Sequence, residues 1–266
     1  MVLNIIPQIA TPISHQFENE YYGKEISDVS DCLEVRERSL NSKLDKQYLF
    51  HIDIDLTHEW DDELRSYLEN ALSKKPELKL ITLQATRCCK EGNLVDGIFQ
   101  LKGKPYTDKE MLSHSVKNTK WLRQIISKSV LIGLENNNYY PTPAYDIITE
   151  GDFISEVIYK NNLFLLLDIA HAMVSAHNKN TSYEEYILRL PLDRLIQLHI
   201  CQPTLIEGGI ARDTHNEPND DMFKEVIRLL NKYQSIKYLT IEYYKDKDTL
   251  ITSINKLRQL VVSAAL

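Results

Sequence analysis

The stretch LFLLLDIAH, residues 163–171, is the most informative part of the sequence for the fold. Five apolar residues run without interruption up to Asp168. A strand this uniformly apolar is typical of a parallel sheet that is covered on both faces. Because Asp168 ends the longest aliphatic run of the chain, we expect no membrane span. The stretch therefore predicts a buried parallel strand that ends in a carboxylate.

Similar apolar runs recur along the chain and alternate with amphipathic stretches. Parallel neighbours need a crossover connection, and eight such strands close a barrel. The predicted fold class is α/β, a (β/α)8 TIM barrel of the xylose-isomerase-like kind, in a single domain over residues 1–266, because no linker or repeat divides the chain. The other predicted strands lie at 3–6, 32–35, 48–54, 78–84, 129–135, 194–200 and 236–242, and the predicted helices at 108–127, 150–160, 183–190, 220–233 and 247–260.

The composition excludes several common functions. The chain has 266 residues, a formal net charge of −7 and only eight glycines, and it contains no glycine-rich phosphate motif or serine-hydrolase motif. The acidic balance argues against binding to nucleic acid, which needs clustered Lys and Arg. Four cysteines without CxxC spacing, and an N-terminus without signal-peptide features, predict a cytoplasmic protein with no membrane partner.

Polar residues that can bind a metal finish many of the apolar strands. In a TIM barrel the carboxyl ends of all strands meet at one face, where the active site lies. Taken singly, each such residue is more often a helix N-cap or a solvated loop residue. Several together in one place would be costly to bury unless a metal or protons balance their charge. These strand-end residues are Glu34, His51, Glu135, Asp168, His199 and Glu242.

Two short motifs add further candidate ligands. His171 follows Asp168 by three residues, so a bend after the strand would direct both to one centre. Asp213 and His215 are two residues apart, which in an extended chain places them on the same side. Together these residues supply about eight nitrogen and oxygen ligands, enough for two or three metals. With no cysteine in register, iron, manganese and zinc all suit the set, and the spacing leaves that choice open.

Several longer segments resemble the multinuclear non-heme iron-dependent oxidative enzymes, the family that includes the methanobactin biosynthesis oxidase. The similarity runs from about Cys32 to Glu242 and is most specific between Glu135 and His215, where order, spacing and flanking residues agree. The segments are ENNNYY (135–140), TEGDFI (149–154), LLLDIAHAMVSAHN (165–178), LPLDRLIQLHI (190–200), RDTHNEP (212–218) and IEYY (241–244).

The resemblance implies a TIM-barrel enzyme that binds two or three non-heme irons, in a mixed Fe(II)/Fe(III) state, and uses dioxygen as co-substrate. Its substrate would be a cysteine in a ribosomally made precursor peptide, with a second protein holding the peptide's leader. The catalytic residues would be Glu135, Asp168 and His199, Asn178 would support the site from outside the ligand set, and the role of Glu34 stays undecided. The implied metal ligands are His51, Glu135, Asp168, His171, His199, Asp213, His215 and Glu242.

Two positions depart from the family pattern. Gln84 stands nearest to the place where the family usually has a histidine at the end of the fourth strand, and an amide oxygen is a poorer ligand than imidazole. The departure implies that the iron which this histidine would hold is absent, bound more weakly or held by other residues. Ala170 and His171 stand where many members carry paired asparagines, and His171 is a competent ligand. Cys88 and Cys89 follow Gln84 closely, and we interpret them as buried small residues rather than redox groups.

Other reaction classes share the barrel and a similar ligand order. Endonuclease IV-type enzymes hydrolyse phosphodiesters with three zincs, and related barrels isomerise sugars. Against the endonuclease stand the missing glycines after the Asp-x-His motif, the amide at Gln84 and the charge balance. A barrel that has lost catalysis and serves as a peptide-binding scaffold is a third alternative, motivated by Gln84 alone. Fold and ligand set do not decide among these functions.

Overall fold

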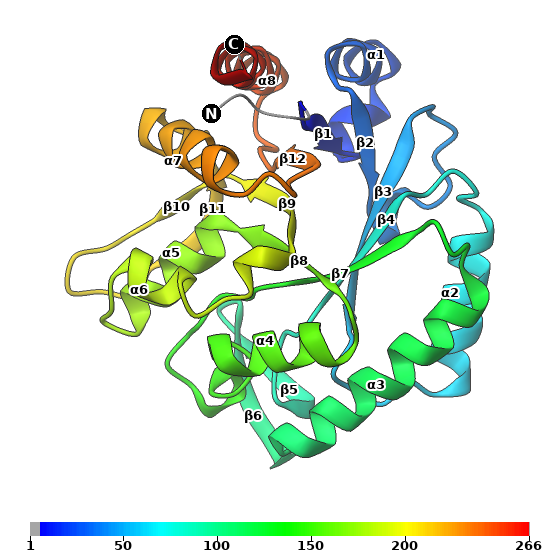
Figure 1. Cartoon of the computed structure of the whole chain (residues 1–266), viewed down its shortest axis with the longest axis vertical. Helices are drawn as coiled ribbons and strands as arrows, with labels where there is room; N and C mark the ends of the chain where they lie inside the picture. The colour runs from blue at the N-terminus through cyan, green and yellow to red at the C-terminus, as the bar shows by residue number, and fades with distance from the viewer. Residues whose placement is uncertain (1–5, 266) are drawn as a thin grey trace.

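An eight-stranded, closed, all-parallel barrel forms the centre of the computed structural model, which describes residues 6–265 (Figure 1). Every strand pairs in parallel with its neighbours, and β1 pairs with both β2 and β12, which closes the ring. The predicted TIM barrel is confirmed. Around the ring the strands are β1 (Gln8–Pro12), β2 (Cys32–Val35), β3 (Gln47–Asp55), β4 (Leu80–Gln84), β7 (Leu131–Glu135), β8 (Phe164–Asp168), β9 (Leu195–Ile200) and β12 (Tyr238–Ile241).

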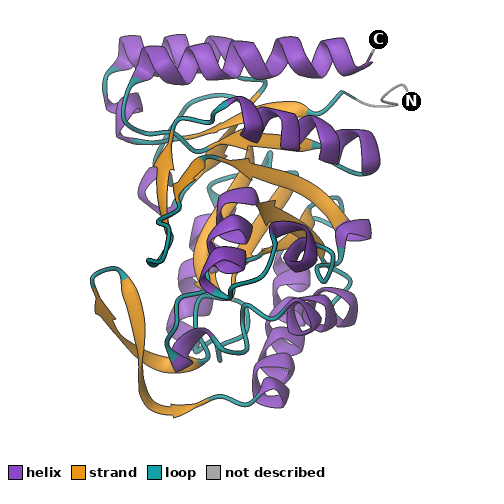
Figure 2. Ribbon diagram, turned by 90° about the vertical axis from the view of Figure 1, so that its left-hand side faces the viewer, coloured by secondary structure: helices purple, strands orange, loops and turns teal. Residues whose placement is uncertain are grey.

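Helices surround the barrel on the outside (Figure 2). The five predicted helices are present within a few residues of their expected ends, and α1, α2 and α5 are additional. Across residues 6–265, none of the helices is both long and apolar enough to cross a bilayer. The helices are α1 (Glu20–Val29), α2 (Asp62–Ser73), α3 (Asp108–Ile125), α4 (Gly151–Lys160), α5 (Ile169–Asn178), α6 (Tyr183–Ile187), α7 (Asp220–Lys232) and α8 (Lys247–Ala265).

Local sequence explains where several helices begin. Thr107 and Glu110 form a capping box at α3, in which each side chain bonds the other's backbone N–H. Asn219 accepts a hydrogen bond from the backbone N–H of Met222 and so caps α7. Between β2 and β3 the described chain forms only a short 3-10 turn, Glu37–Ser39, in place of an α-helix. One of the eight connections is therefore shorter than the repeat predicts.

Some predicted elements were wrong or missed. The first barrel strand is Gln8–Pro12 rather than 3–6; residues 3–5 lie outside the described chain, and Ile6 is exposed. Thr11 and Pro12 break the apolar run of this strand, which hides it from a hydropathy pattern. Two hairpins were also missed, because their strands are short or largely solvent-exposed. They are β5 (Cys89–Val95) with β6 (Ile98–Pro105), and β10 (Gln202–Thr204) with β11 (Arg212–Asn216).

The barrel interior changes from apolar to polar along the strands. A small core cluster fills the amino-terminal half. Since side chains alternate with period two along a strand, the residues two positions further on point into the same interior nearer the carboxyl ends. In this way Glu34 follows Cys32, His51 follows Leu49, and Thr82 and Thr240 follow Leu80 and Tyr238. The apolar cluster consists of Ala10, Cys32, Leu49, Leu80, Ile196 and Tyr238.

Gly133 in β7 tests how tightly this interior is packed. A methyl group there would lie 2.9 Å from Thr82 Cγ2 and 3.4 Å from the carbonyl oxygen of Phe164. We expect Gly133→Ala to lower the free energy of unfolding by about 1–3 kcal/mol, the usual cost of overpacking a core. Urea denaturation measures this. Ser113→Ala, on the exposed face of α3, should change stability by less than about 0.5 kcal/mol, and equal stability of the two variants would contradict the prediction.

Candidate metal centre

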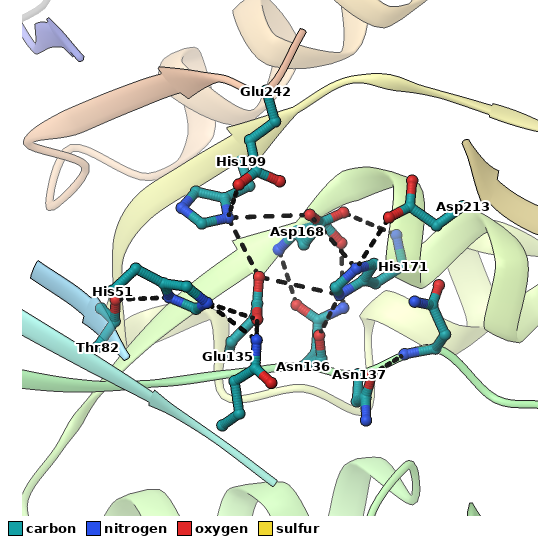
Figure 3. Close-up of polar contacts among 12 residues, drawn as sticks. His51, Thr82, Glu135, Asn136, Asn137, Asp168, His171, His199, Asp213 and Glu242 are labelled. Atoms are coloured by element: carbon teal, nitrogen blue, oxygen red, sulfur yellow. Dashed lines mark hydrogen bonds and ion pairs between the residues drawn. The ribbon is translucent and has the colours of Figure 1, made fainter. Parts of the chain in front are cut away.

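The eight side chains predicted as metal ligands lie together at the carboxyl ends of the strands. Most of them are visible in Figure 3, where Glu135 stands between His51 and His199 and faces His171. Five come from the barrel strands or their ends, one from α5 and two from β11. Residues spread over most of the sequence therefore meet in one place. The set comprises His51, Glu135, Asp168, His171, His199, Asp213, His215 and Glu242.

Glu135, the last residue of β7, occupies the middle of the group. Its Oε1 lies 3.1 Å from His199 Nδ1, and its Oε2 lies 3.4 Å from His51 Nε2. The two carboxylate oxygens thus face different imidazoles. An arrangement of this kind allows one carboxylate to link two ions.

Asp168 uses its two oxygens for two purposes. Oδ1 accepts a hydrogen bond of 2.7 Å from the backbone N–H of His171 and caps α5. Oδ2 lies 3.7 Å from His171 Nε2 and 3.9 Å from His199 Nδ1, and no hydrogen-bond partner reaches it within the described chain. The N-cap role and a ligand role are therefore compatible at this residue.

β11 brings Asp213 and His215 to the opposite side of the group. Asp213 Oδ2 lies 3.4 Å from both His171 Nε2 and His215 Nδ1, and His215 Nε2 lies 3.4 Å from Glu242 Oε2. The expectation of a plain extended chain here was wrong, since His215 has a φ of 44°. Non-glycine residues adopt this left-handed region rarely and at some cost.

Gln84, at the end of β4, lies inside the group. Its Nε2 is 3.0 Å from His51 Nε2 and 3.2 Å from Glu135 Oε2. His51 Nδ1 is held 3.0 Å from Thr82 Oγ1, which turns Nε2 toward Gln84 and Glu135. Gln84 is therefore placed where an additional ligand would contact the same ion as His51.

A second, buried network stands behind His199, and the sequence analysis missed most of it. Glu34 Oε2 lies 3.1 Å from His199 Nε2 and accepts a hydrogen bond of 2.6 Å from Gln197 Nε2. Arg36 Nη2 lies 2.5 Å from Glu34 Oε1 and also binds Glu242 Oε1. Glu34 thus turns His199 Nδ1 toward the metal-ligand group. Arg36 follows Glu34 by two residues, a spacing that places both on one side of an extended chain.

The two asparagines near the site support it from outside. Asn178 Nδ2 donates to the carbonyl oxygens of Tyr139 and Ala211, at 2.8 and 3.2 Å, and its Oδ1 accepts from the Ala211 N–H at 2.8 Å. These bonds fix the chain just before Asp213. The backbone oxygen of Asn136 lies 2.9 Å from His171 Nδ1 and leaves Nε2 facing Asp213.

Burial and charge shift the pKa values of the group in opposite directions. Burial raises the pKa of Asp168 to about 7, although the nearby imidazole of His171 opposes this. Burial also acts to raise the pKa of Glu135, but the neighbouring imidazoles, led by that of His51, outweigh it and lower the value to about 2. Burial likewise acts to raise the pKa of Glu34, but Arg36 and the imidazoles of His199 and His51 together outweigh it and lower the value to about 2. Glu135 and Glu34 are therefore anions held by nearby positive charge, whereas burial favours the neutral form of Asp168.

Three sets of donor atoms lie close enough together to hold an ion. In each set all atoms are within 4.8 Å of one another. His199 Nδ1, like Asp168 Oδ2, is fully buried and makes no hydrogen bond to the described residues. A cavity of about 480 Å³ opens onto the group and is also lined by Arg36, Arg38 and Tyr244. The three sets are Glu135–Asp168–His199, Glu34–His199–Glu242 and Cys201–His215–Glu242.

The third set corrects the expectation that no cysteine is in register. Cys201 directly follows β9, is fully buried and places its Sγ 3.5 Å from Asp213 Oδ1. Cys88 and Cys89 are also buried, and the Cys88 thiol donates to the carbonyl oxygen of Pro143 at 3.0 Å. Burial raises the pKa of Cys88 to about 11, as in an unreactive buried thiol.

The barrel and its donors define a class of protein, a TIM barrel whose imidazoles and carboxylates cluster as candidate metal ligands. Residues 96–261 match the family described as RiPP precursor modification enzyme MbnB/TglH/ChrH, where RiPP denotes a ribosomally synthesised and post-translationally modified peptide. The chain belongs to this family. The resemblance stated from the sequence is thereby confirmed.

Individual relatives agree with this membership. The chain is 32% identical over 118 residues to a UPF0276 protein of Caulobacter vibrioides and 30% identical over 150 residues to one of Vibrio parahaemolyticus. These matches cover 44% and 55% of this chain and 40% and 48% of the relatives, so each spans about half of the relative's length or less.

Solved structures of similar fold extend over nearly the whole chain. A xylose isomerase domain protein from Alicyclobacillus acidocaldarius has a TM-score of 0.63 at 13% identity and covers 98% of this chain and 99% of its own. A D-psicose 3-epimerase has a TM-score of 0.59 at 10% identity and covers 97% and 99%. At these identities the likeness shows the xylose-isomerase-like barrel and nothing about activity.

Replacing Glu34 tests whether the network behind His199 stabilises the fold. Glu34→Gln removes one of the two carboxylates that hold Arg36, so we expect the metal-free protein to lose about 1–3 kcal/mol of unfolding free energy. Guanidinium denaturation in the presence of a chelator measures the loss. Glu77→Gln, an exposed acid, is the matched control. If the two variants were equally stable, Glu34 would contribute no net stabilisation.

Proposed function

We propose that this chain catalyses the iron- and dioxygen-dependent oxidation of a cysteine in a ribosomally made precursor peptide. The observation that carries the proposal is the meeting of eight imidazole and carboxylate side chains around Glu135. Membership of a family of RiPP precursor modification enzymes supports a peptide as the substrate. The proposed metal ligands and catalytic residues are the same residues that the family resemblance implies from the sequence.

The residues present fit two or three iron ions. His199 Nδ1 and Asp168 Oδ2 are buried donor atoms without a hydrogen-bond partner among residues 6–265. A cation coordinated by both atoms would be the partner that buried polar atoms of this kind require. Imidazole and carboxylate together are donors that non-heme iron uses. Around one ion would stand His51, Gln84 and Glu135, around a second Glu135, Asp168, His199 and Glu242, and around a third His171, Asp213 and His215.

Bound iron would supply the affinity for a substrate thiolate and a route by which electrons pass from the cysteine to dioxygen. The protein's own part is to hold the donors rigidly and to keep bulk water away. Glu34 and Thr82 each fix the ring of one ligand histidine through its second nitrogen. The 480 Å³ cavity admits a side chain such as cysteine to the group. Glu135, Asp168 and His199 are the proposed catalytic residues. All three belong to the second of these donor groups, and Glu135 belongs to the first as well.

A partner protein that holds the leader peptide completes the proposal. The family description names a precursor peptide as what such enzymes modify. We propose that the protein acts in the cytoplasm, together with a leader-binding protein. Endonuclease activity and sugar isomerase activity are the alternatives to the proposed oxidation. The identity of the bound metal and the consumption of dioxygen distinguish them from it.

Metal analysis after anaerobic purification from iron-supplemented cells tests the central proposal. We expect two or three irons per chain, with Mössbauer signals of high-spin iron. Glu135→Gln should lower the content by at least one ion, because both oxygens of Glu135 serve neighbouring donors. Glu77→Gln should leave it unchanged. A single bound ion, or zinc that iron cannot replace, would contradict the proposal and favour a hydrolase or isomerase.

Gln84 offers a separate test of the site's weakest position. We expect Gln84→His to raise the occupancy or affinity of one metal, since an imidazole beside His51 is a better ligand than an amide. Isothermal titration of the chelated protein with Mn(II) or Fe(II) under argon measures the change. Gln100→His, at a half-buried position of the hairpin strand β6, is the control. An unchanged binding isotherm would show that Gln84 contacts no ion.

A further inference from the structure

We propose that the thiolate of Cys201 is itself a metal ligand, on the side of the centre formed by β11 and the end of β12. This inference rests on the proposed metal centre and adds a sulfur donor to a set otherwise made of nitrogen and oxygen. It commits to one residue and one atom, Sγ.

The position of Cys201 follows from the strand that precedes it. His199 and Cys201 are two residues apart at the end of β9, so an extended chain directs both side chains to the same side of the barrel mouth. The Cys201 sulfur, a ring nitrogen of His215 and a carboxylate oxygen of Glu242 all lie within 4.8 Å of one another. These three donors come from three separate elements.

The surroundings of Cys201 differ from those of the other thiols. Its Sγ contacts the Asp213 carboxylate at 3.5 Å and is fully buried. Cys32 packs in the apolar cluster at the opposite end of the barrel, and the Cys88 thiol bonds to a backbone carbonyl. The Cys201 thiol thus lies beside three side chains that are proposed metal ligands, Asp213, His215 and Glu242.

A second observation points to a cation at the same place. Asp168 Oδ2 is fully buried and unpartnered among the described residues, and it lies 3.7 Å from His171 Nε2, which in turn is 3.4 Å from Asp213. A cation held beside Asp213 would therefore have this buried oxygen atom nearby, with the imidazole of His171 in contact with both carboxylates. Sulfur within reach of that ion would bind it as a thiolate, with the thiol proton released to solvent.

A thiolate changes which metals the site prefers. Soft sulfur ligands favour iron, cobalt and zinc over magnesium, calcium and manganese. Cys201 would thus bias this side of the centre against the hard divalent ions that an all-oxygen and nitrogen set accepts.

Spectroscopy of the metal-loaded full chain tests the proposal without relying on activity. With zinc bound, X-ray absorption should show a sulfur neighbour at about 2.3 Å. With Co(II) bound under argon, a sulfur-to-cobalt charge-transfer band should appear in the near ultraviolet. Cys201→Ser should lose both signals, whereas Cys88→Ala, which removes another buried thiol, should keep them.

The outcomes separate this inference from the proposed function. Two or three bound ions with only nitrogen and oxygen neighbours would overturn the role of Cys201 and leave the metal centre standing. A protein that binds no metal would overturn both. If Cys201→Ser does not fold, the wild-type spectrum still decides, together with the Cys88→Ala/Cys89→Ala double variant. Loss of the sulfur signal in that double variant would assign the sulfur elsewhere and refute the proposal.

Discussion

The burial of negative charge at the carboxyl ends of the strands is the constraint on which the rest of the site depends. Glu34, Glu135, Asp168 and Glu242 are all buried within one region. Such a group is costly unless positive charge lies close by. Arg36 supplies one permanent positive charge, and four imidazoles stand among the acids. Bound cations would supply the remainder, which explains why so many acids are tolerated in the interior.

The barrel meets this constraint by dividing its interior into two levels. Its amino-terminal half is filled by a cluster of apolar side chains, which gives the strands a rigid base. The polar level begins one side-chain repeat further on, where Glu34 and His51 follow Cys32 and Leu49. Rigid strands at fixed spacing hold ligand atoms more accurately than loops do. The exception is β11, whose ligands stand on a hairpin that Asn178 ties to the barrel.

Family membership and local geometry cover different parts of this centre. The family match spans residues 96–261 and so includes seven of the eight proposed ligands, all except His51. Gln84, Glu34 and Arg36 precede the matched span. For these residues the structure is the source of information, since it places Gln84 beside His51 and Arg36 between two carboxylates. The departure at Gln84 therefore lies within the site and not beside it.

The sequence by itself determined the barrel, most of its strands and the eight side chains that meet. An uninterrupted apolar run predicts a buried parallel strand. An acid or a histidine at its end is predicted to lie at the barrel's active-site face, because the carboxyl ends of all the strands meet there. The hydropathy pattern did not predict the first strand, because Thr11 and Pro12 interrupt its apolar run. It also did not predict the two hairpins, because their strands are short or largely solvent-exposed. Only the tertiary structure decided which atoms face each other. Strand register and the left-handed turn at His215 decide these contacts. Glu34 orients His199, Arg36 joins Glu34 to Glu242, and Cys201 contacts Asp213. The contacts of Glu34 with His199 and of Arg36 with Glu242 join residues far apart in the chain, and no local pattern encodes them.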